Sequence, residues 1–300
     1  MKISIGNAPC SWGAFELNGG LSTPDYPQVL DEMHAAGYRG TELGDWGFMP
    51  TDPHKLQDEL ASRELELISA FVPIPFCDKK RWEEGLSTAL RTAELLATVS
   101  TGKAVLVLSD DNGSNPIRTR QAGRIKPEMG LLPLQWGVFT QGVEYVSRTV
   151  FEQTGLKSVF HHHCAGYVET AAEIGMFLDY ADPAWVDLCL DTGHFRFAGG
   201  DPIRIFRNFA DRVKLVHFKD CSPAIAAQSR TEGWDYHTSL QHGVFCELGQ
   251  GDVDFPAIKT TLEGMDYQGW IVVEQDILPG MGSPLESAIR NREYLHRMGL

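Results

Sequence analysis

The run Val186–Asp191 (VDLCLD) decides the fold, because it is a short apolar stretch that ends in a carboxylate and has counterparts along the chain. Three more apolar runs of the second half end in or near a side chain able to bind a metal: Ser158–His163, Val213–His217 and Trp270–Glu274. Stretches with helical spacing separate them. Parallel strands closed into a barrel bring such ends together on one face, where barrel enzymes place their chemistry. We therefore expect one site built from four strand ends.

The first half of the chain continues the alternation of strand and helix. Its strand-like runs are Ile3–Asn7, Gly40–Leu43, Leu65–Val72 and Ala104–Leu108. Helical patterns are expected at Leu21–Gly37, Pro53–Arg63, Arg81–Val99, Gln135–Thr154, Val168–Leu178, Pro202–Phe209, Phe255–Leu262 and Leu285–Met298. Eight alternations predict an α/β protein, a single (β/α)8 TIM barrel that forms one domain over residues 1–300. A doubly wound sheet is the alternative, but no G-x-G-x-x-G follows any of these runs.

Two segments are too long for simple connections. They are Ser109–Leu134, after the fourth predicted strand, and Asp220–Asp252, after the seventh. Both follow the carboxyl ends of strands, so both are expected on the catalytic face. Loops of this length in a compact domain are usually lids or binding loops. Contacts within an oligomer are the alternative.

Composition limits the function classes. The net charge of −14 argues against a nucleic-acid partner and disfavours an anionic substrate. The six cysteines contain no C-x-x-C pair, which indicates reduced thiols and a cytoplasmic protein. No stretch approaches the roughly 20 apolar residues that cross a bilayer, so no membrane partner is expected.

The four strand ends offer mixed nitrogen and oxygen ligands. Asp191, His217 and Glu274 end their runs, and alternation places His161 and His163 together on one face of theirs. This mixture suits Mn2+ or Co2+, with Zn2+ or Mg2+ as further candidates. Each position also has an ordinary structural explanation: Asp191 could cap the following turn, and His217 could be a hydrogen-bonded core histidine. His162 points the other way and is expected to be structural.

Other polar side chains would surround the ion. Lys219 shares the face of His217 and could polarise a carbonyl group, pair with Asp220 or Glu42, or simply be solvated. His194 follows Asp191 on the next turn, where it could bind a substrate hydroxyl or transfer a proton. Glu42 ends the second strand and would reach the same face.

Aromatic side chains after the first three strands could form apolar walls. These are Trp12, Trp46 and Phe76, for which ordinary packing is the alternative.

Several of these motifs resemble the xylose-isomerase-like barrels. They are Asp191–His194 (DTGH), His217–Asp220 (HFKD), Leu248–Phe255 (LGQGDVDF) and Val272–Asp276 (VVEQD). Within that superfamily the chain looks most similar to the inosose (2-keto-myo-inositol) dehydratase group. The stretches Asn7–Gly13 (NAPCSWG), Gly40–Gly44 (GTELG) and Glu274–Gly280 (EQDILPG), with the triple histidine, carry that similarity. The resemblance spans nearly the whole chain and keeps the order of the motifs.

The resemblance implies a ligand set with one departure. Members typically hold a divalent ion with Glu, Asp, His and Glu from strands five to eight, and Asp191, His217 and Glu274 match three of these. His161 stands where the strand-five glutamate would be. Either His161 or His163 replaces it, or the ion has fewer protein ligands and more water. Because epimerases of the superfamily use both glutamates as acid and base, the departure favours a lyase or an altered isomerase.

The resemblance therefore implies a metal-dependent dehydratase that removes water from inosose or a related keto-polyol through an enolate. Glu42, Glu274 or a strand-five histidine would be the base, and His194 or Lys219 would protonate the departing hydroxyl. Contacts to the substrate are expected from Trp12, Trp46, His163, His194 and Lys219. The alternatives are an isomerase or epimerase using the same site, and a non-catalytic sugar-binding barrel. Barrels of this superfamily often form dimers or tetramers, so a homo-oligomer would fit.

Overall fold

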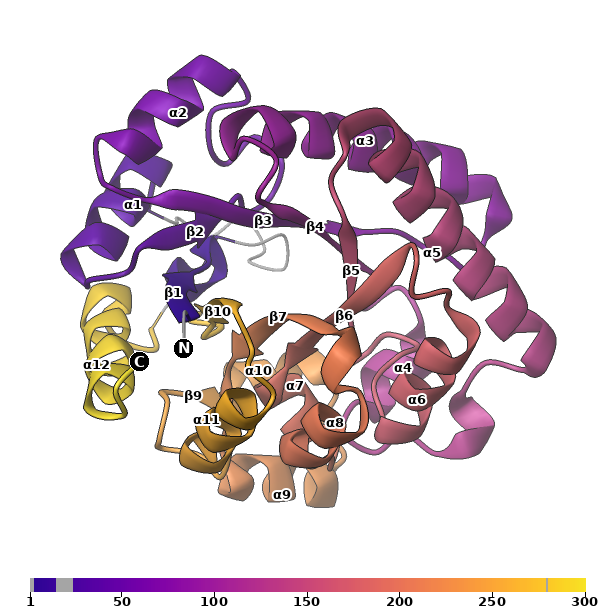
Figure 1. Cartoon of the computed structure of the whole chain (residues 1–300). Helices are drawn as coiled ribbons and strands as arrows, with labels where there is room; N and C mark the ends of the chain where they lie inside the picture. The colour runs from indigo at the N-terminus through magenta and orange to yellow at the C-terminus, as the bar shows by residue number, and fades with distance from the viewer. Residues whose placement is uncertain (1–2, 15–23, 279) are drawn as a thin grey trace.

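Eight parallel strands form a closed barrel in the computed structural model, which describes residues 3–14, 24–278 and 280–300 (Figure 1). The strands are β1 (Ile3–Asn7), β2 (Gly40–Glu42), β3 (Glu66–Pro73), β4 (Val105–Ser109), β5 (Ser158–His161), β6 (Val186–Asp191), β7 (Val213–Phe218) and β10 (Gly269–Val273). They pair in the order β1-β10-β7-β6-β5-β4-β3-β2, and β2 closes the ring onto β1. The predicted barrel is confirmed.

Helices surround the barrel on the outside (Figure 1). They are α1 (Tyr26–Ala35), α2 (Pro53–Ala61), α3 (Trp82–Val99), α5 (Pro133–Thr154), α6 (Ala171–Tyr180), α8 (Pro202–Asn208), α11 (Phe255–Gly264) and α12 (Pro284–Arg297). Short 3-10 helices cover Pro9–Trp12, Lys79–Arg81, Pro127–Met129 and Ala210–Arg212. The predicted first helix began at Leu21, which lies outside the described residues; α1 begins at Tyr26.

Side-chain caps fix where these helices begin. The Oδ1 atom of Asp25 accepts a hydrogen bond from the amide of Gln28, at 3.1 Å, and Pro27 follows in the first turn of α1. Asp201 caps α8 ahead of Pro202, as its sequence predicts. The cap satisfies a backbone amide that the helix leaves free, and proline lacks the amide that would go unpaired there.

Alternation along each strand divides the apolar side chains between two cores. Phe160 of β5 faces outward, and its ring packs against Phe177 of α6 with 4.3 Å between centroids. Val159, its neighbour, belongs to a separate buried cluster with Cys189 and Leu215 of the next two strands. Because His161 lies two residues beyond Val159, its side chain points to the barrel interior.

Both long connections contain ordered structure that the sequence did not predict. After β4 comes α4 (Pro116–Gln121); after β7 come β8 (Asp220–Cys221), α9 (Pro223–Glu232), α10 (Tyr236–Gln241) and β9 (Phe245–Cys246). A further short helix, α7 (Thr192–Phe197), directly follows β6. The two connections share one satellite core, in which Ala122 from the first meets side chains such as Leu240 from the second. Both thus lie over the carboxyl ends of the strands, as expected.

Across the described part of the chain, no helix combines the length and apolarity needed to cross a membrane.

Candidate metal centre and active site

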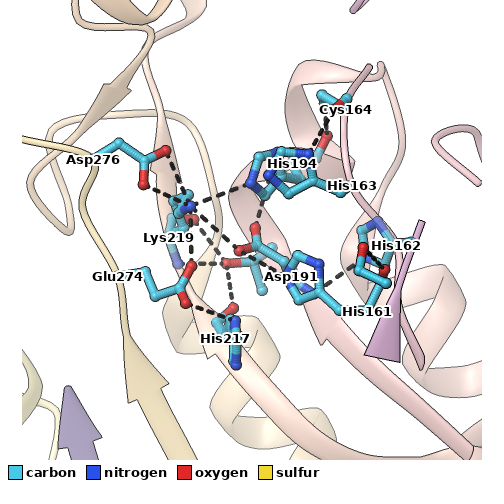
Figure 2. Close-up of polar contacts among 12 residues, drawn as sticks. His161, His162, His163, Cys164, Asp191, His194, His217, Lys219, Glu274 and Asp276 are labelled. Carbon is cyan, nitrogen blue, oxygen red and sulfur yellow. Dashed lines mark hydrogen bonds and ion pairs between the residues drawn. The ribbon is translucent and has the colours of Figure 1, made fainter. Parts of the chain in front are cut away.

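Four buried side chains converge where β5, β6, β7 and β10 end (Figure 2). His161, Asp191, His217 and Glu274 each present one ligand atom, and these atoms all lie within 4.8 Å of one another. Asp191 and His217 are direct neighbours in the register of β6 and β7. The convergence of strand ends expected from the sequence is therefore present in the structure.

Asp191 is both a helix cap and a candidate ligand. Its Oδ1 atom accepts a hydrogen bond of 2.7 Å from the amide of His194 and so caps α7. Its own amide donates to Nε2 of His162, at 3.1 Å. The other oxygen, Oδ2, is buried and accepts no hydrogen bond from the described residues. The capping explanation is thus correct, yet it leaves one oxygen available, and His162 has the structural position expected for it.

The ring of His217 is held between two carboxylates. Its Nε2 atom lies 3.1 Å from Oε1 of Glu42, and its Nδ1 atom lies 3.1 Å from Oε1 of Glu274. The same oxygen of Glu42 accepts a hydrogen bond of 2.7 Å from the hydroxyl of Ser69. When the ring carries a single proton and donates it from Nε2 to Glu42, the lone pair of Nδ1 faces Glu274. This is the arrangement by which a carboxylate orients a metal-binding imidazole.

The donor set fits a divalent cation. Oδ2 of Asp191 is a buried polar atom without a hydrogen bond from the described residues, and such an atom is costly unless a ligand satisfies it. Two carboxylates would also balance the charge of the ion. Although burial opposes it, Cys189, Glu274 and Glu42 raise the pKa of His217 well above its ordinary value, so a bound ion would displace a proton from this ring. Burial and the neighbouring His217 lower the pKa of His161 well below its ordinary value, so its imidazole is neutral at physiological pH, as a ligand must be.

A softer donor lies deeper in the barrel. Cys189 forms a second group with His161 and His217, and their ligand atoms also lie within 4.8 Å of one another. Burial raises the pKa of Cys189 to about 11, so the thiol stays protonated when no ion is bound. Ions that prefer oxygen would choose the carboxylates instead.

Lys219 is buried among acidic groups at the end of β7. Its ammonium nitrogen lies 3.0 Å from Oε2 of Glu274 and 3.2 Å from Oδ2 of Asp276. It also lies 3.2 Å from Nε2 of His194. The suggested pairing with Asp220 or Glu42 is wrong. Asp220 points the other way, and its carboxylate accepts amide hydrogen bonds from Gly249, Gly251 and Val253.

Burial and the charge of Lys219 shift the pKa values of three neighbours, Glu274, Asp276 and His194. Burial alone would raise the pKa of Glu274, but His217 and Lys219 together hold it well below its ordinary value. Burial raises the pKa of Asp276 despite the attraction of Lys219. Burial and the nearby His163 and Lys219 lower the pKa of His194, which is therefore neutral.

A cavity of about 190 Å3 opens onto these groups. Its polar lining includes Glu42, His161, His163, His194, Lys219, Glu274 and Asp276. His163 and His194 lie side by side in it, with 3.8 Å between ring centroids (Figure 2). The Nδ1 atom of His163 is bonded to the carbonyl oxygen of Cys164, which leaves the lone pair on Nε2.

The three aromatic residues that were expected to form apolar walls of the site lie elsewhere. Trp12 is only 2% exposed and donates its indole hydrogen to Glu32, within the main core. Trp46 is 38% exposed, and the guanidinium group of Arg91 covers its ring. Phe76 is fully buried. None of the three is among the described residues that line the cavity: Trp12 and Phe76 pack in the main core, and Trp46 lies at the surface against Arg91.

Other residues take the place of the tryptophans. Apolar walls come from Pro9, Phe71 and Leu240, and Tyr236 adds a phenol from α10. Asp276 was also absent from the predicted site, although it shares a strand face with Glu274 and the sequence could have revealed it. Tyr236 had no such signal, because the sequence did not predict its helix.

The fold and the converging strand ends define a class: a (β/α)8 barrel with a candidate metal centre at the carboxyl ends of its strands. The chain belongs to the xylose isomerase-like TIM barrel family, whose model matches residues 30–297.

Two relatives match this chain over nearly their whole length. An inosose dehydratase of Geobacillus kaustophilus is 34% identical over 98% of this chain and 94% of its own length. An inosose dehydratase of Lacticaseibacillus casei is 30% identical over 98% of this chain and 97% of its own. Among solved structures, a probable 3-DHS dehydratase of Bacillus anthracis superposes with a TM-score of 0.70 at 14% identity, over 99% of both chains. That likeness concerns the fold alone.

Proposed function

We propose that this chain is a metal-dependent dehydratase that removes water from 2-keto-myo-inositol or a related keto-polyol. The observation that carries the proposal is the buried quartet of His161, Asp191, His217 and Glu274 beneath the cavity. Its full-length relatives named inosose dehydratase support the reaction and the substrate.

The charge of the cavity favours an uncharged substrate. Lys219 is the one cationic side chain among the described residues that line it, and its ammonium group already pairs with carboxylates. The carboxylates of the lining are Glu42, Asp45, Asp111, Glu274 and Asp276. A phosphate or carboxylate on the substrate would meet these groups without an arginine to hold it. A neutral polyol offers hydroxyl groups that can donate to them.

The ligand set favours Mn2+ or Co2+. Imidazole nitrogen in two of four positions is softer than the carboxylate-rich set of related barrels, which makes Mg2+ less suited than a transition ion. When bound, the ion supplies a Lewis acid that stabilises negative charge on the ketone oxygen.

His163 is the best-placed base for the proton next to the ketone. The carboxylate of Glu42 already contacts Ser69 and His217. The carboxylate of Glu274 already contacts His217 and Lys219. The Nε2 lone pair of His163 has no such partner among the described residues and borders the cavity. Burial lowers the pKa of His163 to about 3, so its ring is unprotonated before the substrate binds. Negative charge developing on the substrate stabilises the imidazolium that results.

Lys219 is suited to assist the departing hydroxyl. Its ammonium group borders the cavity and is fixed by Glu274 and Asp276. A proton donated to the leaving oxygen would be replaced from solvent, because Nε2 of the neutral His194, 3.2 Å away, accepts from the ammonium group and has no proton to return. General acid catalysis of this kind contributes about 10²–10⁴-fold to a rate.

The test is an assay with Mn2+- or Co2+-loaded protein and 2-keto-myo-inositol. We expect an ultraviolet-absorbing dehydrated diketone, and no product from an Asp191→Asn variant that keeps the helix cap. Exchange of solvent deuterium into the substrate without loss of a hydroxyl would instead identify an isomerase or epimerase. Sugar binding with neither exchange nor product would identify a binding protein.

A further inference from the structure

Tyr236 lies over the cavity at the start of α10, in the long segment that follows β7. The residue is only 3% exposed. Its ring contacts the two histidines of the cavity wall, with centroid distances of 5.5 Å to His163 and 6.2 Å to His194. It therefore approaches the site from a segment that supplies none of the candidate ligands.

The hydroxyl group of Tyr236 makes no hydrogen bond with any residue in 3–14, 24–278 or 280–300. Buried phenols normally have a partner. Two others in this chain do: the hydroxyl of Tyr38 donates to the carbonyl oxygen of Ala288 at 3.0 Å, and that of Tyr267 to Trp270 at 2.9 Å. Burial and the neighbouring Asp276 raise the pKa of Tyr236 well above its ordinary value, so the phenol keeps its proton.

We propose that Tyr236 is a specificity-determining residue whose hydroxyl hydrogen-bonds a ring hydroxyl of the bound keto-polyol. The inference rests on the proposed function of the site. With the ketone next to the quartet, the other hydroxyl groups of the substrate would extend along the cavity wall of His163 and His194, which Tyr236 contacts. A phenol can both donate and accept, which matches a neutral hydroxyl group.

The first test replaces the phenol oxygen alone. Tyr236→Phe should raise KM for 2-keto-myo-inositol about 3- to 10-fold, the loss expected for one neutral hydrogen bond, while kcat changes less. Binding of myo-inositol, which has no ketone and so cannot react in this way, should weaken by the same factor in calorimetric titration. Because the free protein loses no hydrogen bond, the urea midpoint should stay unchanged.

Tyr267→Phe is the matched control. It removes a buried phenol oxygen that donates to the backbone carbonyls of Lys214 in β7 and Trp270 in β10, away from the cavity lining. This variant should lower the urea midpoint and leave the affinity for myo-inositol unchanged.

A series of monodeoxy inositols identifies the partner hydroxyl. The wild type should bind one member of the series less tightly than myo-inositol, and Tyr236→Phe should not distinguish that member from myo-inositol. Equal affinities of wild type and Tyr236→Phe for the whole series would overturn the inference. If 2-keto-myo-inositol is not dehydrated but the affinities for the monodeoxy series still depend on Tyr236, the proposed reaction is wrong and the contact with Tyr236 is retained. If the wild type binds none of these compounds, both fail.

Discussion

Glu42 and His217 lie 175 positions apart in the chain, yet Oε1 of Glu42 and Nε2 of His217 are 3.1 Å apart inside the barrel. The contact joins the end of β2 to the end of β7 across the barrel. It turns Nδ1 of His217 toward Glu274 and thus prepares the imidazole for the ion. We propose that Glu42, expected to be catalytic, acts as a positioning residue for His217.

Removing this support should weaken metal binding. We expect Glu42→Ala to reduce Mn2+ affinity by about 10- to 100-fold, because the ring of His217 is no longer held. Glu42→Gln should lose less, since its amide oxygen can still accept from Nε2. Competition with a chelator measures both. Equal affinity in wild type and Glu42→Ala would show that the contact does not orient His217.

The residue at the end of β5 should set the choice of ion. His161→Glu adds a third carboxylate to the quartet. The affinities for Mg2+ and Mn2+ relative to the affinity for Zn2+ should therefore rise by about tenfold or more. The ratio of dissociation constants for the three ions is the measurement, and His163→Glu is the control because His163 is outside the quartet. An unchanged ratio in His161→Glu would remove His161 from the ligand set.

Lys219 should be important for stability as well as activity. Without its charge, the buried Asp276 loses its ammonium partner and Glu274 keeps only His217, so Lys219→Met should cost about 3–5 kcal/mol of unfolding free energy in metal-free protein. Lys259→Met, which breaks the more exposed pair with Glu263, should cost only about 0.2–0.5 kcal/mol. Urea denaturation of the two variants checks the difference. Comparable losses would mean that the buried pairs contribute no more than a surface pair.

The strands were predictable because their signal is local. Ile3–Asn7 and Val186–Asp191 were predicted with their exact bounds, as apolar runs of the length of one strand. Convergence of His161, Asp191, His217 and Glu274 then followed from barrel geometry, which places the carboxyl ends of parallel strands at one rim.

The partners of Lys219 were not predictable from neighbours in the sequence. Adjacent residues of a strand point to opposite faces, so Asp220 could not reach the ammonium group. The true partner, Asp276, lies 57 positions further along the chain, after β10, the strand that pairs with β7 in the barrel. Trp12 and Trp46 were misplaced for a related reason: they lie outside regular strands, where no period fixes the direction of a side chain. Tyr236 belongs to a helix of six residues, too short to give a periodic signal.

Glu169, outside the metal centre, should make stability depend on pH. Burial raises its pKa from 4.5 to about 7, although its two oxygens accept amide hydrogen bonds from Gly123 and Ala165. The folded state therefore holds the proton more tightly than the unfolded chain. The stabilisation is complete below pH 4.5 and is lost as the pH rises to about 7, a total of about 3 kcal/mol. Glu169→Gln cannot ionise, so the unfolding free energy of the wild type minus that of the variant should fall across this window. Urea denaturation at several pH values between 4.5 and 8 measures that difference. A difference that rises with pH would mean that the two amide hydrogen bonds outweigh burial and that the pKa of Glu169 is depressed.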